Sequence, residues 1–453
     1  MDAKRKVQAL ADMAAYVAKA IEKERGHIKV VSHFDCDGIC AGAIIYKTLR
    51  YLDKDFDISF VKQLGKDEIV ELSHEKNSML IFCDVGSGQL DMIRKYIPNI
   101  PVVVLDHHPP EGCAWGKLYH LNPHFVGIDG SNEISGAGVC YVLARSLSVQ
   151  SKKLIDLAIV GACGDVQYQN GEFSGVNRLL LEDAEYSGAI RCEKGLKLFG
   201  RYTKPIHKAI EYSTDPFIPD VSGNESAAVQ FLSELGIAVV DRKGKWRRLC
   251  DLSKEEEKKL ATVLVLENIS EGGTASDLIG TIYVLKNNYD IREFSSVLNA
   301  CGRLEKPAEG LRICIGAGEN IDKILHEYRK KIATAVFWAK KNRASFVVTK
   351  SATYIPAGGN IDENIIGTVV SILLKKDVKT DVVVGFGNAG RDWVKVSARA
   401  KPKAVGVDLG SVVRKVVEKL GGESEGGGHS HAAGAKIPKG SEMKFVELAE
   451  EIL

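Results

Sequence analysis

The feature of this sequence that most constrains its fold is an apolar run at residues 101–105, followed directly by Asp106, His107 and His108. A short run of β-branched residues without polar interruption is typical of a strand buried on both faces of a parallel sheet. Functional groups in α/β proteins lie at the carboxyl ends of such strands. We therefore expect these three polar side chains at the functional edge of a parallel sheet.

Three other apolar segments lead to acidic or imidazole side chains in the same way, at residues 27–32, 79–83 and 157–161. We expect all of them to be strands whose carboxyl ends meet at one edge. The side chains that follow the four segments are five carboxylates and three imidazoles: Asp35, Asp37, Asp84, Asp106 and Asp165, with His33, His107 and His108. A single aspartate after a strand is more often the N-cap of the next helix, and this alternative stays open for Asp106. Four such ends together indicate a metal site.

The composition of this cluster favours hard divalent ions. Carboxylates with a few imidazoles suit Mn²⁺ or Mg²⁺, and the ten cysteines form no CxxC pair that would indicate structural zinc. We expect two divalent ions, Mn²⁺ in preference to Mg²⁺, held about 4 Å apart. Such a pair generates a hydroxide and stabilises the attacking and leaving oxygens in phosphoryl hydrolysis. A bridging carboxylate is needed, and Asp84, after the expected central strand, is the candidate.

Length and composition narrow the class of protein. A chain of 453 residues is too long for one core, so two or three domains are expected. Its 45% hydrophobic and 26% charged residues are those of a globular protein, and the formal net charge of +2 means that any anion-binding surface is local. Irregularly spaced cysteines and a charged N-terminus without an apolar signal segment predict a reduced, cytoplasmic setting and no membrane span.

The order of strand and helix patterns predicts the fold class and the domains. Alternating patterns predict an α/β chain with a doubly wound parallel-sheet domain at residues 1–190. A basic linker helix and a mostly helical insertion are predicted at residues 191–325, and a smaller α/β domain at residues 326–453. Within the last domain, the glycine-rich residues 426–434 are expected to form a loop that opens onto a helix or strand.

Two basic segments lie in the middle of the chain. Arginines and lysines recur every three or four residues from 191 to 208, which predicts one charged helix face that follows a nucleic-acid backbone; an ordinary solvated face is the alternative. Residues 242–248 form a second basic patch around Trp246, either a hairpin that binds nucleic acid or a surface turn.

The ordered set of polar motifs resembles the DHH phosphoesterase superfamily. The matching residues are His33, Asp35, Asp37-Gly38, Asp84, Asp106-His107-His108 and Gly164-Asp165. Asn122-Pro123 and residues 135–139 resemble the RecJ branch, and residues 396–399 with Gly426-Gly427-Gly428-His429 resemble the DHH-associated domain. The size and the middle insertion look most like archaeal RecJ-like nucleases, the GINS-associated nuclease group.

The resemblance implies a role for each motif residue. One ion would be held by His33, Asp35 and Asp84, and the other by Asp37, Asp84, His107 and Asp165. His108 would contact the scissile phosphate or transfer protons, and Asp106 would orient His107 from behind the ligands. Ser397, Arg399, Gly427, Gly428 and His429 would bind substrate through backbone amides and a guanidinium. Only Phe34 separates His33 from Asp35, whereas related pyrophosphatases have three residues there, so a supporting role for His33 stays open.

The resemblance also implies an activity and partners. It implies a two-metal exonuclease that releases mononucleotides from single-stranded DNA in the 5′-to-3′ direction, with RNA degradation from the 3′ end as a further activity. GINS and the replicative MCM helicase are the implied protein partners. One alternative is a nanoRNase or cyclic-dinucleotide phosphodiesterase, against which the long insertion argues. Another is a non-catalytic replication-helicase subunit, against which the full carboxylate set argues.

Overall fold

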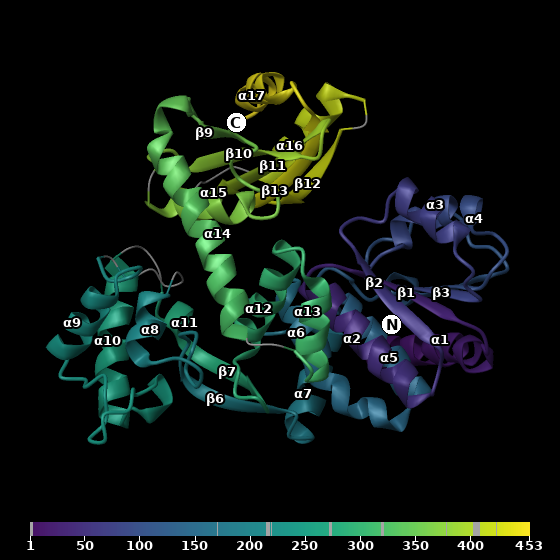
Figure 1. The fold of residues 1–453 in the computed structure, drawn as a ribbon, viewed down its shortest axis with the longest axis horizontal. Helices are drawn as coiled ribbons and strands as arrows, with labels where there is room; N and C mark the ends of the chain where they lie inside the picture. Colours follow the sequence, from purple (N-terminus) through teal and green to yellow (C-terminus); the bar gives the residue numbers. More distant parts are fainter. Residues whose placement is uncertain are drawn as a thin grey trace. The chain divides into compact units, whose positions relative to one another are not determined.

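The chain forms two compact units, residues 1–321 and 322–453, and each is described by itself (Figure 1). The computed structural model describes residues 3–169, 171–213, 218, 220–270, 274–318, 321–376, 378–401, 408–422 and 424–453. Among these residues, no helix combines the length and the apolar composition that crossing a bilayer requires.

The first unit is built on a five-stranded, all-parallel sheet with the order β2-β1-β3-β4-β5. Its strands are β1 (Ile28–His33), β2 (Phe56–Val61), β3 (Met79–Cys83), β4 (Val102–Leu105) and β5 (Leu118–Leu121). Every residue of β3 is buried, as expected for the central strand of a sheet covered on both faces. The expected doubly wound parallel sheet is therefore confirmed.

Helices cover both faces of this sheet (Figure 1). Helices α3 (Lys66–His74) and α4 (Leu90–Tyr96) pack on one face through a shared apolar cluster. The other face carries α1 (Ala3–Lys23), α2 (Cys36–Tyr51) and α5 (Gly136–Leu147), and α6 (Ile155–Gly164) and α7 (Gly175–Tyr186) follow. Short 3₁₀ turns lie at Ser87–Gln89, Pro123–Val126 and Val149–Leu154.

The prediction of a strand at residues 157–161 is wrong, because this segment lies inside α6. Leu157, Ala158, Ile159 and Val160 are all buried, since α6 packs against helices on several sides. A helix that is apolar all round has the same short run of hydrophobic residues as a buried strand. Asp165 therefore follows a helix, not a strand.

The middle of the chain forms a smaller core of its own. It contains β6 (Ile190–Leu196), α8 (Ile206–Glu211), α9 (Glu225–Glu234), the 3₁₀ turn Leu249–Asp251, α10 (Lys254–Ser270), α11 (Ala275–Leu278) and β7 (Ile279–Leu285). Strands β6 and β7 pair antiparallel. Helices α12 (Ile291–Arg303) and α13 (Pro307–Ile315) follow and pack against α2, and α12 also packs against α6.

The predicted basic helix at residues 191–208 is wrong. Its first half is strand β6, whose backbone hydrogen bonds are supplied by the distant β7, and Pro205 precedes the short α8. The cations do not share one face, and several are paired with acids: Arg191 with Glu193 at 2.7 Å, and Arg201 with Glu257 at 2.7 Å. The second basic patch is a turn closed by an isolated bridge between Val240 and Trp246.

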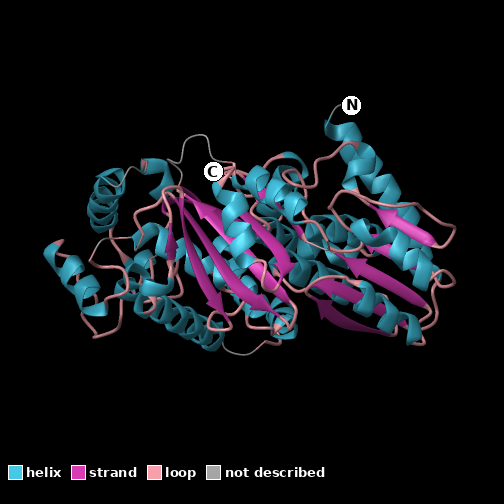
Figure 2. Ribbon diagram, turned by 90° about the horizontal axis from the view of Figure 1, so that it is seen from above, coloured by secondary structure: helices cyan, strands magenta, loops and turns pink. Residues whose placement is uncertain are grey.

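The second unit carries a six-stranded sheet with the order β12-β13-β11-β10-β9-β8. Figure 2 shows the strands of the chain in magenta and its helices in cyan. Its strands are β8 (Val347–Val348), β9 (Ala352–Gly358), β10 (Val382–Ala389), β11 (Trp393–Ala400), β12 (Glu425–His429) and β13 (Ala432–Pro438). Helices α16 (Leu409–Leu420) and α17 (Glu442–Glu450) pack on one face, and α14 (Ile321–Lys341) and α15 (Ile366–Lys376) on the other. A 3₁₀ turn at Arg343–Ser345 follows α14.

The expected glycine-rich loop at residues 426–434 is instead the hairpin of β12 and β13. Its glycines serve close packing, because a Cβ on Gly426 would lie 2.8 Å from the side chain of Val413 on α16. A glycine-rich strand next to a helix has the composition of a flexible turn, which is why the sequence pattern misled.

Candidate metal centre

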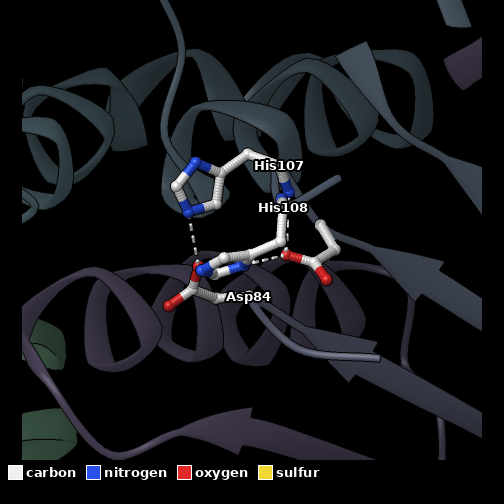
Figure 3. Close-up of side chains that lie close together, drawn as sticks. Asp84, His107 and His108 are labelled. Carbon is white, nitrogen blue, oxygen red and sulfur yellow. Dashed lines mark hydrogen bonds and ion pairs between the residues drawn. The ribbon is translucent and has the colours of Figure 1, made fainter. Parts of the chain in front are cut away.

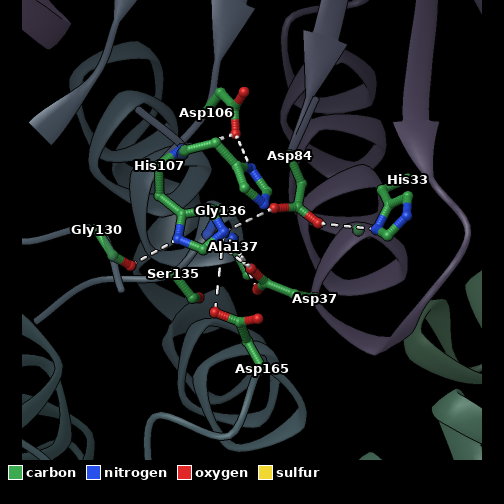
Figure 4. A network of polar contacts seen from close by, with 12 residues as sticks. His33, Asp37, Asp84, Asp106, His107, Gly130, Ser135, Gly136, Ala137 and Asp165 are labelled. Atoms are coloured by element: carbon green, nitrogen blue, oxygen red, sulfur yellow. Dashed lines mark hydrogen bonds and ion pairs between the residues drawn. The ribbon is translucent and has the colours of Figure 1, made fainter. Parts of the chain in front are cut away.

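The polar residues predicted from the strand ends lie together in the first unit (Figure 4). His33 is the last residue of β1, Asp35 is the N-cap of α2, and Asp37 lies in the first turn of that helix. Asp84 follows β3 and Asp106 follows β4 at the same edge, because Cys83 pairs with Leu105 in the sheet. The fifth carboxylate, Asp165, reaches this place as the C-cap of α6.

Asp84 has the central position in this cluster. Its Oδ1 lies 3.2 Å from Nε2 of His107 (Figure 3). Its Oδ2 lies 3.5 Å from Nδ1 of His33 (Figure 4). The side chain is 2% exposed, its φ of 61° is left-handed, and its Oδ1 is buried without a hydrogen bond. A Cβ on Gly136 would lie 2.4 Å from this oxygen, so only glycine permits the approach of α5. A buried, unsatisfied carboxylate oxygen is costly without a cation, and it therefore fits a metal ligand.

The ligand atoms around Asp84 fall into compact groups. His33, Asp35 and Asp84 offer atoms that all lie within 4.8 Å of one another, and Asp37, His107 and Asp165 form a second group by the same measure. The sequence resemblance assigns one ion to the first group, and the other ion to the second group together with Asp84. A third group joins Asp84 and His107 to Asp106 and His108. The first two groups are rich in oxygen and have one imidazole each, which suits Mn²⁺ or Mg²⁺.

Asp37 is held by the N-terminus of α5. Its Oδ2 accepts the N–H of Gly136 at 2.7 Å, and its Oδ1 accepts the N–H of Ala137 at 3.0 Å. Helix N-termini stabilise anions through their unpaired amides, which keeps a buried carboxylate in place. The second lone pair of each oxygen remains for a cation.

His107 is oriented by a backbone carbonyl. Its Nδ1 donates to the oxygen of Gly130 at 2.7 Å, and its Nε2 points at three carboxylates, 3.2 Å from Asp84, 3.8 Å from Asp165 and 3.9 Å from Asp37. Fixing the proton on one ring nitrogen leaves the other nitrogen to bind a metal. Burial alone would lower the pKa of His107, but these carboxylates raise it well above its usual value.

Asp106 and His108 form a separate pair beside the cluster. Asp106, 1% exposed, accepts the backbone N–H groups of Ser87 at 2.9 Å, His107 at 2.8 Å and His108 at 3.2 Å. Its Oδ1 also binds the Nδ1 of His108 at 2.7 Å. Asp106 therefore orients the ring of His108, whereas it contacts His107 only through the backbone. The His108 side chain is 55% exposed, and Asp106 raises its pKa.

The charges of the cluster oppose one another. Burial raises the pKa of Asp165 to about 6, together with the charges of Asp84 and Asp35, although the charge of His107 acts in the opposite direction. Burial and the charges of Asp84 and Asp165 also raise the pKa of Asp37. Burial acts in the same direction on Asp35, but His33 lowers the pKa of that carboxyl to about 2. These shifts indicate a place where added positive charge is stabilising.

Several residues that support the ligands could not be assigned a role from the sequence, although Asn122 lies in a segment that resembles the RecJ branch. Gln167 donates to Asp165 Oδ2 at 2.8 Å and to the carbonyl of Gly130 at 2.8 Å, and so connects two parts of the second ligand group. Asn122 donates to the carbonyl of His108 at 2.8 Å. Ser135 lies in a segment that resembles the RecJ branch, and only the fold shows that it is the N-cap of α5, the helix start that holds Asp37.

The predicted substrate residues lie in the second unit. Ser397 and Arg399 are alternate residues of β11 and therefore share one face of the sheet. Gly427 of β12 lies on the same face, because Gly434 of β13 pairs with both Ser397 and Gly427. A Cβ on Gly367 of α15 would lie 3.0 Å from both Arg399 Nη2 and Ser397 Oγ. Gly428 faces α16 instead. The side chain of His429 lies outside the described part of the chain, and its backbone ends β12.

Comparison with known families matches three domain models along the chain. Residues 27–162 match the DHH family, N-terminal domain, residues 198–281 match the DHH-CID domain, and residues 344–453 match the DHHA1 domain. An uncharacterized protein of Methanocaldococcus jannaschii, MJ0831, is 32% identical over 453 residues, which cover 96% of each chain.

Solved structures share the fold. RecJ from Thermus thermophilus in complex with Mn²⁺ is 16% identical with a TM-score of 0.59; the match covers 98% of this chain and 54% of that one, so this chain spans about half of that protein. CDC45 from Entamoeba histolytica is 11% identical with a TM-score of 0.59, and the match covers 99% of this chain and 98% of that one.

Proposed function

The chain belongs to the DHH superfamily and is RecJ-like within it, and from this premise we propose that it is a two-metal exonuclease that releases mononucleotides from single-stranded nucleic acid. The superfamily and the acidic cluster indicate a metal-dependent phosphoesterase. The single observation that carries the proposal is the position of Asp84, whose two oxygens face two separate groups of ligands.

The residues of the site have two proposed roles, metal binding and contact with the substrate. His33, Asp35 and Asp84 hold one ion, and Asp37, Asp84, His107 and Asp165 hold the other. When bound there, two divalent ions, Mn²⁺ in our proposal and Mg²⁺ as the alternative, would supply a hydroxide and neutralise charge on the phosphoryl oxygens. His108, with Nδ1 fixed on Asp106, presents Nε2 to the substrate and donates a hydrogen bond or a proton to a phosphate oxygen. Asp84 and His108 are thus the catalytic residues.

The substrate assignment rests on the second unit and on the family. Ser397, Arg399, Gly427, Gly428 and His429 are proposed to bind the nucleotide chain, with a guanidinium for phosphate and backbone amides beside it. The proposed substrate is single-stranded DNA degraded 5′ to 3′, with RNA degraded from its 3′ end as a second activity. Residues 1–190, 191–325 and 326–453 are the proposed catalytic, insertion and substrate-binding parts.

A non-catalytic scaffold is the second candidate, and the similarity to CDC45 favours it. GINS and the MCM helicase, which the sequence resemblance implies, are the proposed partners in a cytoplasmic replication or repair complex. A buried cluster of mutually repelling carboxylates is costly in a protein that only binds others, which favours the enzyme.

The experiment uses the full chain with Mn²⁺ and a long single strand labelled at either end, beside a labelled dinucleotide. Stepwise shortening of the long strand, with the 5′-terminal label released first as a mononucleotide, is the expected result. Hydrolysis of the dinucleotide alone would show a nanoRNase-type enzyme. Stable binding without hydrolysis of either substrate would favour the scaffold.

A further inference from the structure

Helix α12 lies against the candidate metal centre, although it belongs to none of the three matched domains. The matches end at residue 281 and resume at residue 344, and α12 spans Ile291–Arg303. It packs against α2 and α6, the helices that carry Asp37 and Asp165. We propose that Asn299 of α12 is a positioning residue, which fixes the start of α2 and the end of α6, where metal ligands lie. This inference rests on the metal site proposed above.

The amide of Asn299 joins the start of α2 to the end of α6. Its Oδ1 accepts the backbone N–H of Cys36 at 3.2 Å, and its Nδ2 lies 3.5 Å from the carbonyl oxygen of Gly164 as donor. Cys36 stands between Asp35 and Asp37, and Gly164 directly precedes Asp165. One side chain therefore connects the start of α2, which serves both ligand groups, to the end of α6, which serves the second.

Gly302 supports the start of α2 one turn further along α12. A Cβ on this residue would lie 2.4 Å from the backbone oxygen of Phe34, so the loop before Asp35 packs directly on the helix backbone. The segment that contains Cys36 also has no free space on the side of α6, because a Cβ on Gly164 would lie 2.4 Å from the Sγ of Cys36. With no spare room on either side, the position of the loop follows the position of α12.

The start of α12 is anchored independently. Glu293, which is 6% exposed, accepts the N–H of Gly200 at 3.1 Å and the hydroxyl of Thr203 at 2.8 Å. Arg292 pairs with Asp290 at 2.6 Å. A helix held at its first turn gives Asn299 a fixed place, which a positioning residue needs.

The test measures Mn²⁺ binding to the substrate-free full chain by calorimetry. Asn299→Ala should weaken binding by about 10- to 100-fold, the usual cost of losing a residue that orients metal ligands, and excess Mn²⁺ should restore nuclease activity. Ser296→Ala, at an exposed position on the same helix, is the matched control and should bind as the wild type does.

Gly302→Ala is a second variant, which displaces the same loop without removing a polar group. It should also weaken Mn²⁺ binding, whereas Gly116→Ala, at a glycine with no atom within 4 Å of the added Cβ, should not. Thermal denaturation without metal accompanies each variant. Wild-type affinity in folded Asn299→Ala, or in Gly302→Ala if Asn299→Ala does not fold, would overturn the inference. A wild-type chain that binds no Mn²⁺ would instead overturn the proposed function.

Discussion

Asp84 Oδ1 lies 3.2 Å from Nε2 of His107, and the two residues come from neighbouring parallel strands that end at the same level. The carboxylate is buried and that oxygen lacks a hydrogen bond, while the imidazole is fixed by Gly130 at its other nitrogen. The carboxylate oxygen and the imidazole nitrogen are both of the kind that would bind a divalent ion at this edge of the sheet.

Replacement of Asp84 by asparagine tests the bridge. Asp84→Asn keeps the size of the side chain but removes the charge, so Mn²⁺-dependent turnover should fall by more than about 100-fold, the upper cost of losing a supporting residue. The metal-free fold should be as stable or more stable, because one of several repelling carboxylates is gone. Turnover assays and thermal denaturation with a chelator check both points. Asp67→Asn, exposed on α3, should change neither, and full turnover in Asp84→Asn would contradict the bridge.

The pH dependence follows from Asp165. Its pKa is raised to about 6, above the value of about 4 expected in the unfolded chain. The metal-free folded state therefore binds a proton that the unfolded state releases, so its stability decreases as pH rises from about 4 through about 6. Mn²⁺ needs the ionised carboxylate, and its affinity should fall by up to about tenfold per pH unit below about pH 6.

Calorimetric Mn²⁺ titrations and chemical denaturation across this range check the two opposite trends. Asp165→Asn should flatten the change of metal-free stability in this window. An Mn²⁺ affinity that does not change below about pH 6 would show that Asp165 is not a ligand.

His108 should act on the substrate and not on the metal. Its Nδ1 is taken by Asp106 and its side chain is more than half exposed. His108→Gln should lower kcat by about 10²- to 10⁴-fold, the range for a lost proton donor, and leave Mn²⁺ affinity unchanged. Single-turnover kinetics and calorimetry separate the two effects. His74→Gln, exposed on α3, is the control, and a large loss of Mn²⁺ affinity in His108→Gln would make His108 a ligand.

Arg399 should contribute one phosphate contact. Arg399→Ala should weaken binding of a single strand and reduce the slope of log affinity against log salt by about 0.7, the value for one phosphate of a single strand. Fluorescence anisotropy over a series of salt concentrations measures the slope. Lys415→Ala, exposed on α16, should leave it unchanged. An unaltered slope in Arg399→Ala would remove Arg399 from the substrate site.

The sheet and the positions of most site residues could be predicted because the signal is local. The runs at β3 and β4 are buried throughout, so each has an uninterrupted apolar pattern that ends where the polar residues begin, and β1 shows a weaker form of it with Lys29 and Ser32 inside the strand. The apolar run in α6 has the same appearance, yet it forms a helix because other helices surround it. Likewise, β6 takes its conformation from pairing with β7, far away in the sequence.

The supporting residues could not be predicted, because tertiary packing alone brings them to the site. Nothing local to Gln167 or Asn299 marks these amides as partners of Asp165 and of the Cys36 backbone. The amides of Gly136 and Ala137 meet Asp37 across about a hundred residues of sequence. Such contacts depend on how the helices cross, which residue patterns do not encode locally.

The two-metal centre is tested by the number of Mn²⁺ ions that one chain binds, measured by calorimetry at neutral pH without substrate. A centre bridged by Asp84 binds two ions per chain in the wild type and loses at least one of them in Asp84→Asn, while Asp67→Asn keeps both. One ion or none in the wild type, or two ions in folded Asp84→Asn, would contradict a two-metal centre bridged by Asp84.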